Sequence, residues 1–165
     1  MKRKYLILFS LSGLIISTDQ LLKQWFHSHI PLNSGFEFIP GLIRFSHRQN
    51  TGFAFGAIDA SAQSFNNIFM LGVPAFALIL MVLIFIKLRD NQMVTSVALT
   101  SVLSGAVGNL IDRVQHGYVV DYLEVHLGKS QILPSLNLAD VAIISGVLLM
   151  LFNTIRQEFR KNPNE

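Results

Sequence analysis

Four of the six aspartates in this chain lie at or near one end of long apolar runs. They are Asp19, Asp112, Asp121 and Asp140. A carboxylate at the edge of a bilayer is costly, so each is expected to be paired or functional. Two carboxylates that converge resist simultaneous ionisation, so one can hold a proton while the other deprotonates water. The aspartates therefore make hydrolysis by an acid–base pair a candidate chemistry.

Asp140 and Asp121 each have a structural alternative. Asp140 is the only charge in the apolar run 136–155. Asn137 as N-cap and Asp140 at the third helical position would form something close to a capping box, and a carboxylate suits the positive end of a helix dipole. Asp121 lies in the alternating segment GYVVDYLEV. It could simply face water, and spacing alone favours that interpretation.

Further polar residues accompany these aspartates. Asp19 and Lys23 are four residues apart with the acid first, which favours an ion pair on a helix, and a role toward substrate is the alternative. Along 101–113 small residues recur every four positions, which allows helices to pack closely. Packing does not explain the polar cluster that ends this stretch, Asn109, Asp112 and Arg113. The Arg113 guanidinium could neutralise a carboxylate or bind a backbone carbonyl.

The composition indicates a membrane protein. Apolar residues make up 51% and charged residues 14% of the 165 residues, whereas soluble domains have roughly 25% charged residues. The mean hydropathy is +0.46. A transmembrane helix needs about 20 apolar residues, and four runs meet this: 5–22, 68–86, 93–111 and 136–155. We predict an all-α integral membrane protein with four transmembrane helices, in a single domain over 1–165.

The Lys and Arg residues indicate how the runs are oriented. Of the 13, 8 flank the chain ends and the 87–92 turn, and 5 are spread over two longer segments. By the positive-inside rule both termini are cytoplasmic, while 23–67 and 112–135 face outward. This placement of the basic residues also argues against nucleic acid as a partner. A cleaved signal peptide is the alternative for the first run, but no small-x-small cleavage site follows it.

The two outward segments have different expected structures. Residues 35–58 are rich in Phe and Ile with Gly and Pro breaks, and are expected to form short strands that end in a glycine-rich turn. Residues 59–67 are expected to form a short polar helix that leads into the second span. The segment 112–135 has turn signals at Gly117, Gly128 and Pro134.

Other functions have less support. The chain has no cysteine, which excludes a thiol nucleophile and a thiolate metal site. No Gly-x-Ser-x-Gly motif, His-Glu-x-x-His motif or phosphate-binding loop occurs. A proton-coupled transporter would need charges near the span centres, whereas here they cluster at one edge. A membrane scaffold that packs against a partner helix through its glycines is a further alternative.

Five motifs, in order, resemble those of the bacterial lipoprotein signal peptidase family, also called signal peptidase II. They are DQLLK (19–23), NTGFAFG (50–56), SGAVGNLIDR (104–113), GYVVDY (117–122) and LNLAD (136–140). The resemblance covers nearly the whole chain. It implies an aspartic endopeptidase of the bacterial cytoplasmic (inner) membrane with its active site at the outer face. Such an enzyme removes signal peptides from prolipoproteins, cleaving before a cysteine that carries a diacylglyceryl group.

The resemblance also implies roles for individual residues. Asp121 and Asp140 would be the catalytic pair. The supporting and substrate-binding positions would be Asp19, Lys23, Asn50, Gly52, Gly108, Asn109, Asp112, Arg113, Asn137 and Ala139. The family fold adds a small extracytoplasmic β-sheet and a short outer helix, for which 35–58 and 59–67 are the counterparts. The implied partners are a diacylglyceryl prolipoprotein and membrane lipids, with no metal, organic cofactor or obligate protein partner.

The chain departs from the family pattern at three positions. Phe53 stands where a small residue is more frequent, Ser104 where a second glycine is common, and Leu136 where Phe is frequent. None of these removes a catalytic position. A large side chain at 53 is expected to change the shape of the outer segment over the site and, as a result, to alter substrate preference.

Overall fold

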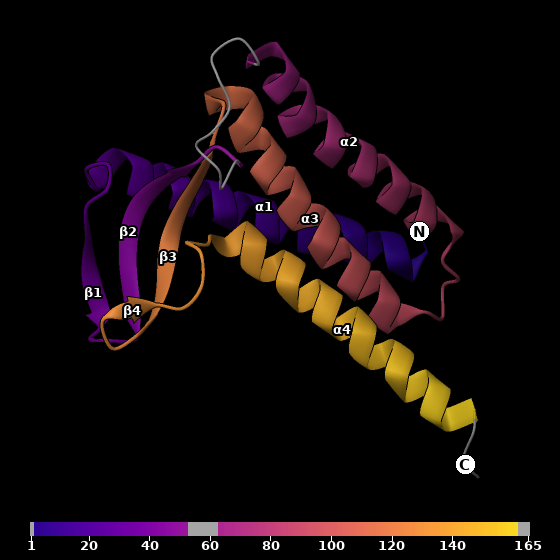
Figure 1. The fold of residues 1–165 in the computed structure, drawn as a ribbon. Helices are drawn as coiled ribbons and strands as arrows, with labels where there is room; N and C mark the ends of the chain where they lie inside the picture. The colour runs from indigo at the N-terminus through magenta and orange to yellow at the C-terminus, as the bar shows by residue number, and fades with distance from the viewer. Residues whose placement is uncertain (1, 53–62, 162–165) are drawn as a thin grey trace.

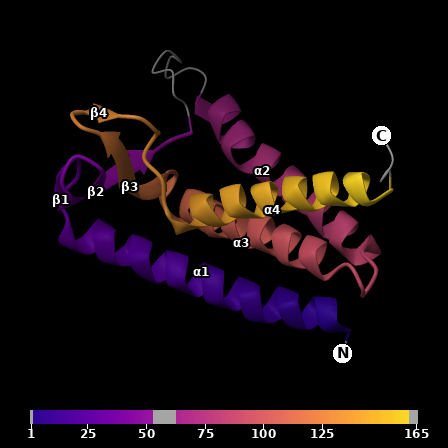
Figure 2. The same ribbon diagram turned by 90° about the horizontal axis from the view of Figure 1, so that it is seen from below.

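The computed structural model describes residues 2–52 and 63–161. Within these ranges the order of elements is α1 (Arg3–His29), β1 (Gly35–Ile39), β2 (Ile43–Asn50), α2 (Gln63–Lys87), α3 (Met93–His116), β3 (Val119–Leu127), β4 (Ser130–Gln131) and α4 (Leu138–Lys161). The strands lie at one end of the helices (Figures 1 and 2). The first turn of α1 and the last turn of α4 lie at the other. We call these the sheet end and the terminal end.

The helices have the properties of membrane spans. Four are long and apolar enough to cross a bilayer, over Arg3–His29, Met70–Lys87, Met93–His116 and Leu138–Arg160. Large apolar side chains on their surfaces are exposed, such as Leu14 at 66%, Phe76 at 62% and Leu148 at 60%. Such surfaces are favourable against lipid rather than water. The predicted fold class, four transmembrane helices with a small sheet, is confirmed.

Helix α3 is central and contacts α1, α2 and α4. Its small residues allow this position. A Cβ atom at Gly105 would collide with the carbonyl oxygen of Ala139, and one at Gly146 of α4 would lie 2.6 Å from that of Ala98. Because glycine avoids both clashes, the backbones of α3 and α4 approach closely. This contact packs the start of α4 against the sheet-end half of α3.

Helices α1 and α3 are longer than their apolar runs predict. The sequence predicts outward segments that begin at 23 and 112, but α1 continues to His29 and α3 to His116. These turns stay helical because their polar side chains form hydrogen bonds and ion pairs inside the protein. A hydropathy profile contains no information on such contacts. Lys23 and Asp112 are only 3% and 2% exposed. Helix α3 ends where Gly117 adopts a left-handed φ of 77°, a conformation that favours glycine.

The strands form an antiparallel sheet in the order β1–β2–β3–β4, which confirms the strands expected within 35–58. Strand β3 is fixed from two directions. Tyr122 stacks on Phe26 of α1 with ring centroids 4.5 Å apart. Leu123 pairs with Leu136, just before α4 begins. These contacts hold Asp121 of β3 beside the start of α4.

Part of one outward segment lies outside the described residues. The glycine-rich turn of 53–58, with Phe53, belongs there, and so does the beginning of the helix expected at 59–67. From Gln63 onward the chain is already α2. The expected helix that leads into the second span is therefore confirmed for 63–67, where it forms the beginning of α2.

A buried lysine holds the terminal end together. Lys4 is 2% exposed, and its ammonium donates to the carbonyl oxygens of Ile86 at 2.8 Å and Leu88 at 2.6 Å. A cation suits the carbonyl groups that are left without helical partners at the end of α2. The contact ties α1 to α2 far from the sheet end.

Candidate active site

Asp140 caps the helix that carries it. Its backbone N–H donates to Asn137 Oδ1 at 2.9 Å, and the Asn137 N–H donates back to Asp140 Oδ2 at 3.1 Å. The capping interpretation of these residues is therefore confirmed. Asp140 has a further contact, because its Oδ1 accepts a 2.7 Å hydrogen bond from the Asn109 side chain of α3. Capping and participation in a polar site are thus compatible in one carboxylate.

Asp121 is buried. Only 2% of it is exposed, so the interpretation of a residue that faces water is wrong. Its Oδ1 accepts a 2.7 Å hydrogen bond from the Asn137 side chain. Its Oδ2 accepts one of 2.9 Å from Asn50, the last residue of β2. The burial results from helices that pack against β3, which an alternating sequence pattern cannot report.

Asn137 joins the two aspartates. Its side-chain amide donates to Asp121, and its backbone N–H donates to Asp140. Asn109 completes the link, since its Oδ1 accepts from the Asn137 amide at 3.2 Å while its own amide donates to Asp140. Two asparagines therefore bring carboxylates from β3 and α4 into one site.

The carboxylates have unequal surroundings. Burial and the neighbouring Asp140 charge raise the pKa of Asp121 to about 6, although hydrogen bonds from Asn50 and Asn137 favour its ionised form. Asp121 therefore keeps a proton more readily than an ordinary aspartate does. A pair in which one member retains a proton is the arrangement that acid–base hydrolysis requires.

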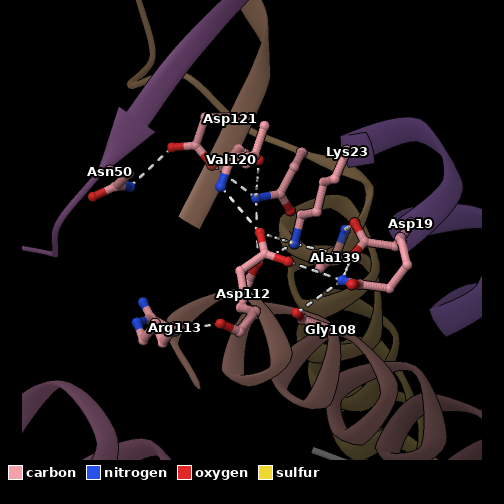
Figure 3. A network of polar contacts seen from close by, with 12 residues as sticks. Asp19, Lys23, Asn50, Gly108, Asp112, Arg113, Val120, Asp121 and Ala139 are labelled. Carbon is pink, nitrogen blue, oxygen red and sulfur yellow. Dashed lines mark hydrogen bonds and ion pairs between the residues drawn. The ribbon is translucent and has the colours of Figure 1, made fainter. Parts of the chain in front are cut away.

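A buried ionic network lies close to Asp121 (Figure 3). Lys23 of α1 contacts the carboxylates of Asp19 at 2.9 Å and Asp112 at 3.2 Å. Gln20 donates to Asp112 at 2.9 Å and to the Gly108 carbonyl oxygen at 3.2 Å. The predicted ion pair between Asp19 and Lys23 is confirmed. The pair is buried between α1 and α3.

The network also binds backbone groups of β3 and α4. Asp112 Oδ2 accepts from the Val120 N–H at 3.0 Å, and Asp19 Oδ1 accepts from the Ala139 N–H at 2.9 Å. Gly108 makes room for this arrangement, because a Cβ there would lie 2.6 Å from Asp19 Oδ2. These predicted supporting residues are therefore brought together with the aspartate pair.

Two other predicted supporting residues lie at the margin of the site. Gly52 adopts a φ of 77°, and its N–H donates to Asn50 Oδ1 at 2.9 Å. Among the described residues, Arg113 hydrogen-bonds only the Asn109 carbonyl oxygen, at 3.4 Å. Of its two expected roles, binding a carbonyl is therefore the one that the structure shows. Figure 3 places Arg113 and Asn50 on the side of the network away from Lys23.

Sequence reasoning missed two contributors to the site. One is Gln20, which bridges α1 and α3. The other is Tyr122, whose hydroxyl oxygen accepts the Leu138 N–H of α4 at 3.0 Å. Each directly follows an aspartate of the site, Asp19 or Asp121. That adjacency is the one sequence signal that could have indicated them.

Four spanning helices, with two aspartates linked by asparagines at their sheet end, define an integral membrane protein with a polar site at one end. A family model described as signal peptidase (SPase) II matches residues 11–156. The chain belongs to this peptidase family, because the match covers most of its length.

Individual relatives agree with this membership. The chain is 34% identical to the lipoprotein signal peptidase of Syntrophus aciditrophicus over 161 residues, which cover 97% of this chain and 99% of that protein. It is 35% identical to the one of Geobacter metallireducens over 164 residues, 99% of each. A solved structure described as a bacterial membrane enzyme has a TM-score of 0.79 at 27% identity, with 98% of this chain and 93% of that one covered. The family and fold are confirmed, while the catalytic roles of individual residues stay predictions.

Proposed function

We propose that this protein is a membrane aspartic endopeptidase that removes the signal peptide from diacylglyceryl-modified prolipoproteins, cleaving before the lipidated cysteine. The observation that carries the proposal is the pair of carboxylates, Asp121 and Asp140, that both accept hydrogen bonds from Asn137. Membership of the signal peptidase II family supports the reaction. The relatives named lipoprotein signal peptidase support the substrate class.

The proposed reaction uses one water and a proton held by the pair. Asp140 takes a proton from the water, whose oxygen attacks the carbonyl carbon of the scissile bond, while protonated Asp121 donates to the carbonyl oxygen. When the tetrahedral intermediate collapses, the C–N bond breaks and the cysteine nitrogen leaves with the proton that Asp140 had taken. One hydroxyl of the intermediate returns its proton to Asp121, which leaves a carboxylic acid and restores the starting state of the pair. The raised pKa of Asp121 supports its assignment as the protonated partner.

The depth of the site suits such a substrate. A signal helix and acyl chains lie in the bilayer, so the scissile bond is presented near the membrane surface. The pair lies at the sheet end of the spanning helices, where α4 begins. We assign Asn50 and Arg113, at the margin of the site, to binding substrate carbonyls and holding the peptide in line with the water.

We infer that the protein lies in the bacterial cytoplasmic membrane with both termini in the cytoplasm. The concentration of 8 of the 13 Lys and Arg residues at the chain ends and the 87–92 turn supports this orientation. The sheet end and its aspartate pair then face outward. Contacts of α3 with the other helices and with β3 support a single membrane-embedded domain.

Asp121→Asn and Asp140→Asn test the proposal. Each keeps the side-chain size and removes an acid–base group, so we expect kcat to fall by about 10³-fold or more. The measurement is cleavage of a diacylglyceryl-modified precursor by purified enzyme in detergent, followed by mass spectrometry. Asp90→Asn, in an exposed turn at the terminal end, is the matched control and should cleave normally. Full cleavage by either Asp121→Asn or Asp140→Asn would sink the proposal.

A further inference from the structure

The ammonium of Lys23 has no donor left for a substrate. The residue is 3% exposed. Its Nζ contacts Asp19 Oδ2 at 2.9 Å, Asp112 Oδ2 at 3.2 Å and Asn109 Oδ1 at 2.8 Å. A lysine ammonium has three donors, and these acceptors use all of them. Lys23 can therefore influence a reaction only through the groups that it binds.

The first of these groups leads to Asp121. The carboxylate oxygen of Asp112 that contacts Lys23 also accepts the backbone N–H of Val120. Val120 is the residue directly before Asp121 on β3. The position of the Asp112 carboxylate thus fixes where the backbone of β3 enters the site.

The second group leads to Asp140 in the same way. Asp19 contacts Lys23 through one carboxylate oxygen and accepts the Ala139 N–H with the other. Ala139 is the residue directly before Asp140 and is fully buried. Each carboxylate that Lys23 holds therefore binds the N–H that precedes one member of the pair (Figure 3).

The third group contacts Asp140 directly. Because Lys23 can only donate, the Asn109 side chain must turn its oxygen toward Lys23. Its NH₂ group then faces Asp140 and donates to it at 2.7 Å. The contact with Lys23 thereby determines that the NH₂ group of Asn109, and not its oxygen, faces the Asp140 carboxylate.

Stability alone does not account for this arrangement. Burying two carboxylates and an ammonium carries a large desolvation cost, and well-packed apolar residues are often at least as stable. The terminal end offers a comparison, because Lys4 is equally buried. Within the described residues its hydrogen bonds go only to backbone carbonyls of α2 and the turn that follows it, and its ammonium also lies near the Tyr5 and Phe85 rings. A structural lysine in this protein thus needs no carboxylate partners.

We propose that Lys23 is a positioning residue that, through its three acceptors, sets the separation and orientation of Asp121 and Asp140. The inference rests on the proposed function, since it assigns Lys23 a role in that reaction. It assigns no substrate contact to Lys23.

Lys23→Met, compared with Lys4→Met, tests the inference. Methionine keeps much of the length of the side chain and removes the ammonium. We expect kcat per folded enzyme to fall about 10²-fold in Lys23→Met, the effect of misplacing reacting groups by about 1 Å. KM should stay within about twofold, because no substrate contact is lost. Lys4→Met should keep the wild-type kcat. Steady-state cleavage of a lipid-modified precursor gives both constants, and size-exclusion chromatography in detergent gives the folded fraction.

Asp112→Asn and Asp112→Ala provide the test if Lys23→Met does not fold. Asparagine keeps an acceptor for the Val120 N–H, and alanine keeps none. We expect the asparagine variant to retain at least about tenfold more kcat than the alanine variant, at similar KM. Equal kcat values for the two variants would overturn the inference.

The remaining outcomes separate this inference from the proposed function. Unchanged kcat in Lys23→Met, together with an inactive Asp121→Asn, overturns the positioning role and leaves the catalytic pair in place. A rise in KM without a fall in kcat overturns it in favour of a substrate contact. Equal losses in Lys23→Met and Lys4→Met overturn it in favour of a structural role. Cleavage by Asp121→Asn overturns the proposed function itself.

Discussion

At the scale of single residues, the hydrogen bonds that Asp121 accepts within the described part of the chain come from two asparagines and not from cations. The amides orient the carboxylate and favour its ionised form, but burial outweighs them, and the pKa of Asp121 is raised to about 6. In the proposed reaction, a proton kept at this position is the one that Asp121 donates. The neutral donors thus fix geometry without removing the proton that the proposed reaction uses.

The raised pKa predicts the alkaline limb of the pH profile. Protonated Asp121 is lost as the pH rises through about 6, so kcat/KM should fall above that value. Asn50→Leu removes a hydrogen bond that favours the ionised form. The pKa of Asp121 should then rise further, and the limb should move to higher pH while the maximal rate falls. Cleavage rates measured across the pH range check this, and a limb that moves to lower pH would contradict the assignment of Asp121.

At the scale of elements, the first turn of α4 is the most constrained part of the site. Helix N-termini leave backbone N–H groups without intrahelical partners. Here the first three N–H groups each have a side-chain acceptor from a different segment. The acceptors, in order, are Tyr122 of β3, Asp19 of α1 and Asn137 of the preceding loop. Asp140 therefore cannot shift along or around the helix axis without breaking several hydrogen bonds.

The close packing of α3 predicts the effect of Gly108→Ala. The added Cβ would lie 2.6 Å from Asp19 Oδ2, so the Asp19 carboxylate must move. We expect a loss of about 1–3 kcal/mol in stability, typical of overpacking, together with reduced kcat. Gly13→Ala is the matched control, because nothing lies within 4 Å of a Cβ there and alanine favours helix. Thermal unfolding in detergent and cleavage rates distinguish the two, and equal behaviour would contradict the packing argument.

At the scale of the whole molecule, the sheet end carries the aspartate pair and the terminal end carries most of the basic residues. The helix surfaces between them expose large apolar side chains. The two ends therefore face opposite sides of the bilayer, and in the proposed orientation the terminal end faces the cytoplasm. Precursors would then be cleaved at the outer face, at the depth where their lipid-modified cysteine lies.

Single cysteines test this orientation, because the chain has none of its own. Lys129→Cys in the β3–β4 turn should react with a membrane-impermeant maleimide in spheroplasts, whose cytoplasmic membrane is intact. Arg89→Cys, at the terminal end, should react only after the membrane is opened. Both positions are exposed, so a difference in labelling reports the side of the membrane. The reverse pattern would contradict the orientation.

Features that depend on local composition were predictable from the sequence: four apolar runs of spanning length, the strands within 35–58 and the capping of α4 by Asn137 and Asp140. The five motifs identified the family. The burial of Asp121, the extension of α1 and α3 through polar turns, and the participation of Gln20 and Tyr122 could not be predicted from local sequence. These depend on contacts between distant residues, such as Asn50 with Asp121, 71 positions apart, and Asp19 with Ala139, 120 apart. Hydropathy and secondary-structure propensity depend only on a residue and its neighbours along the chain. Burial and hydrogen-bond partners are fixed only when the helices pack.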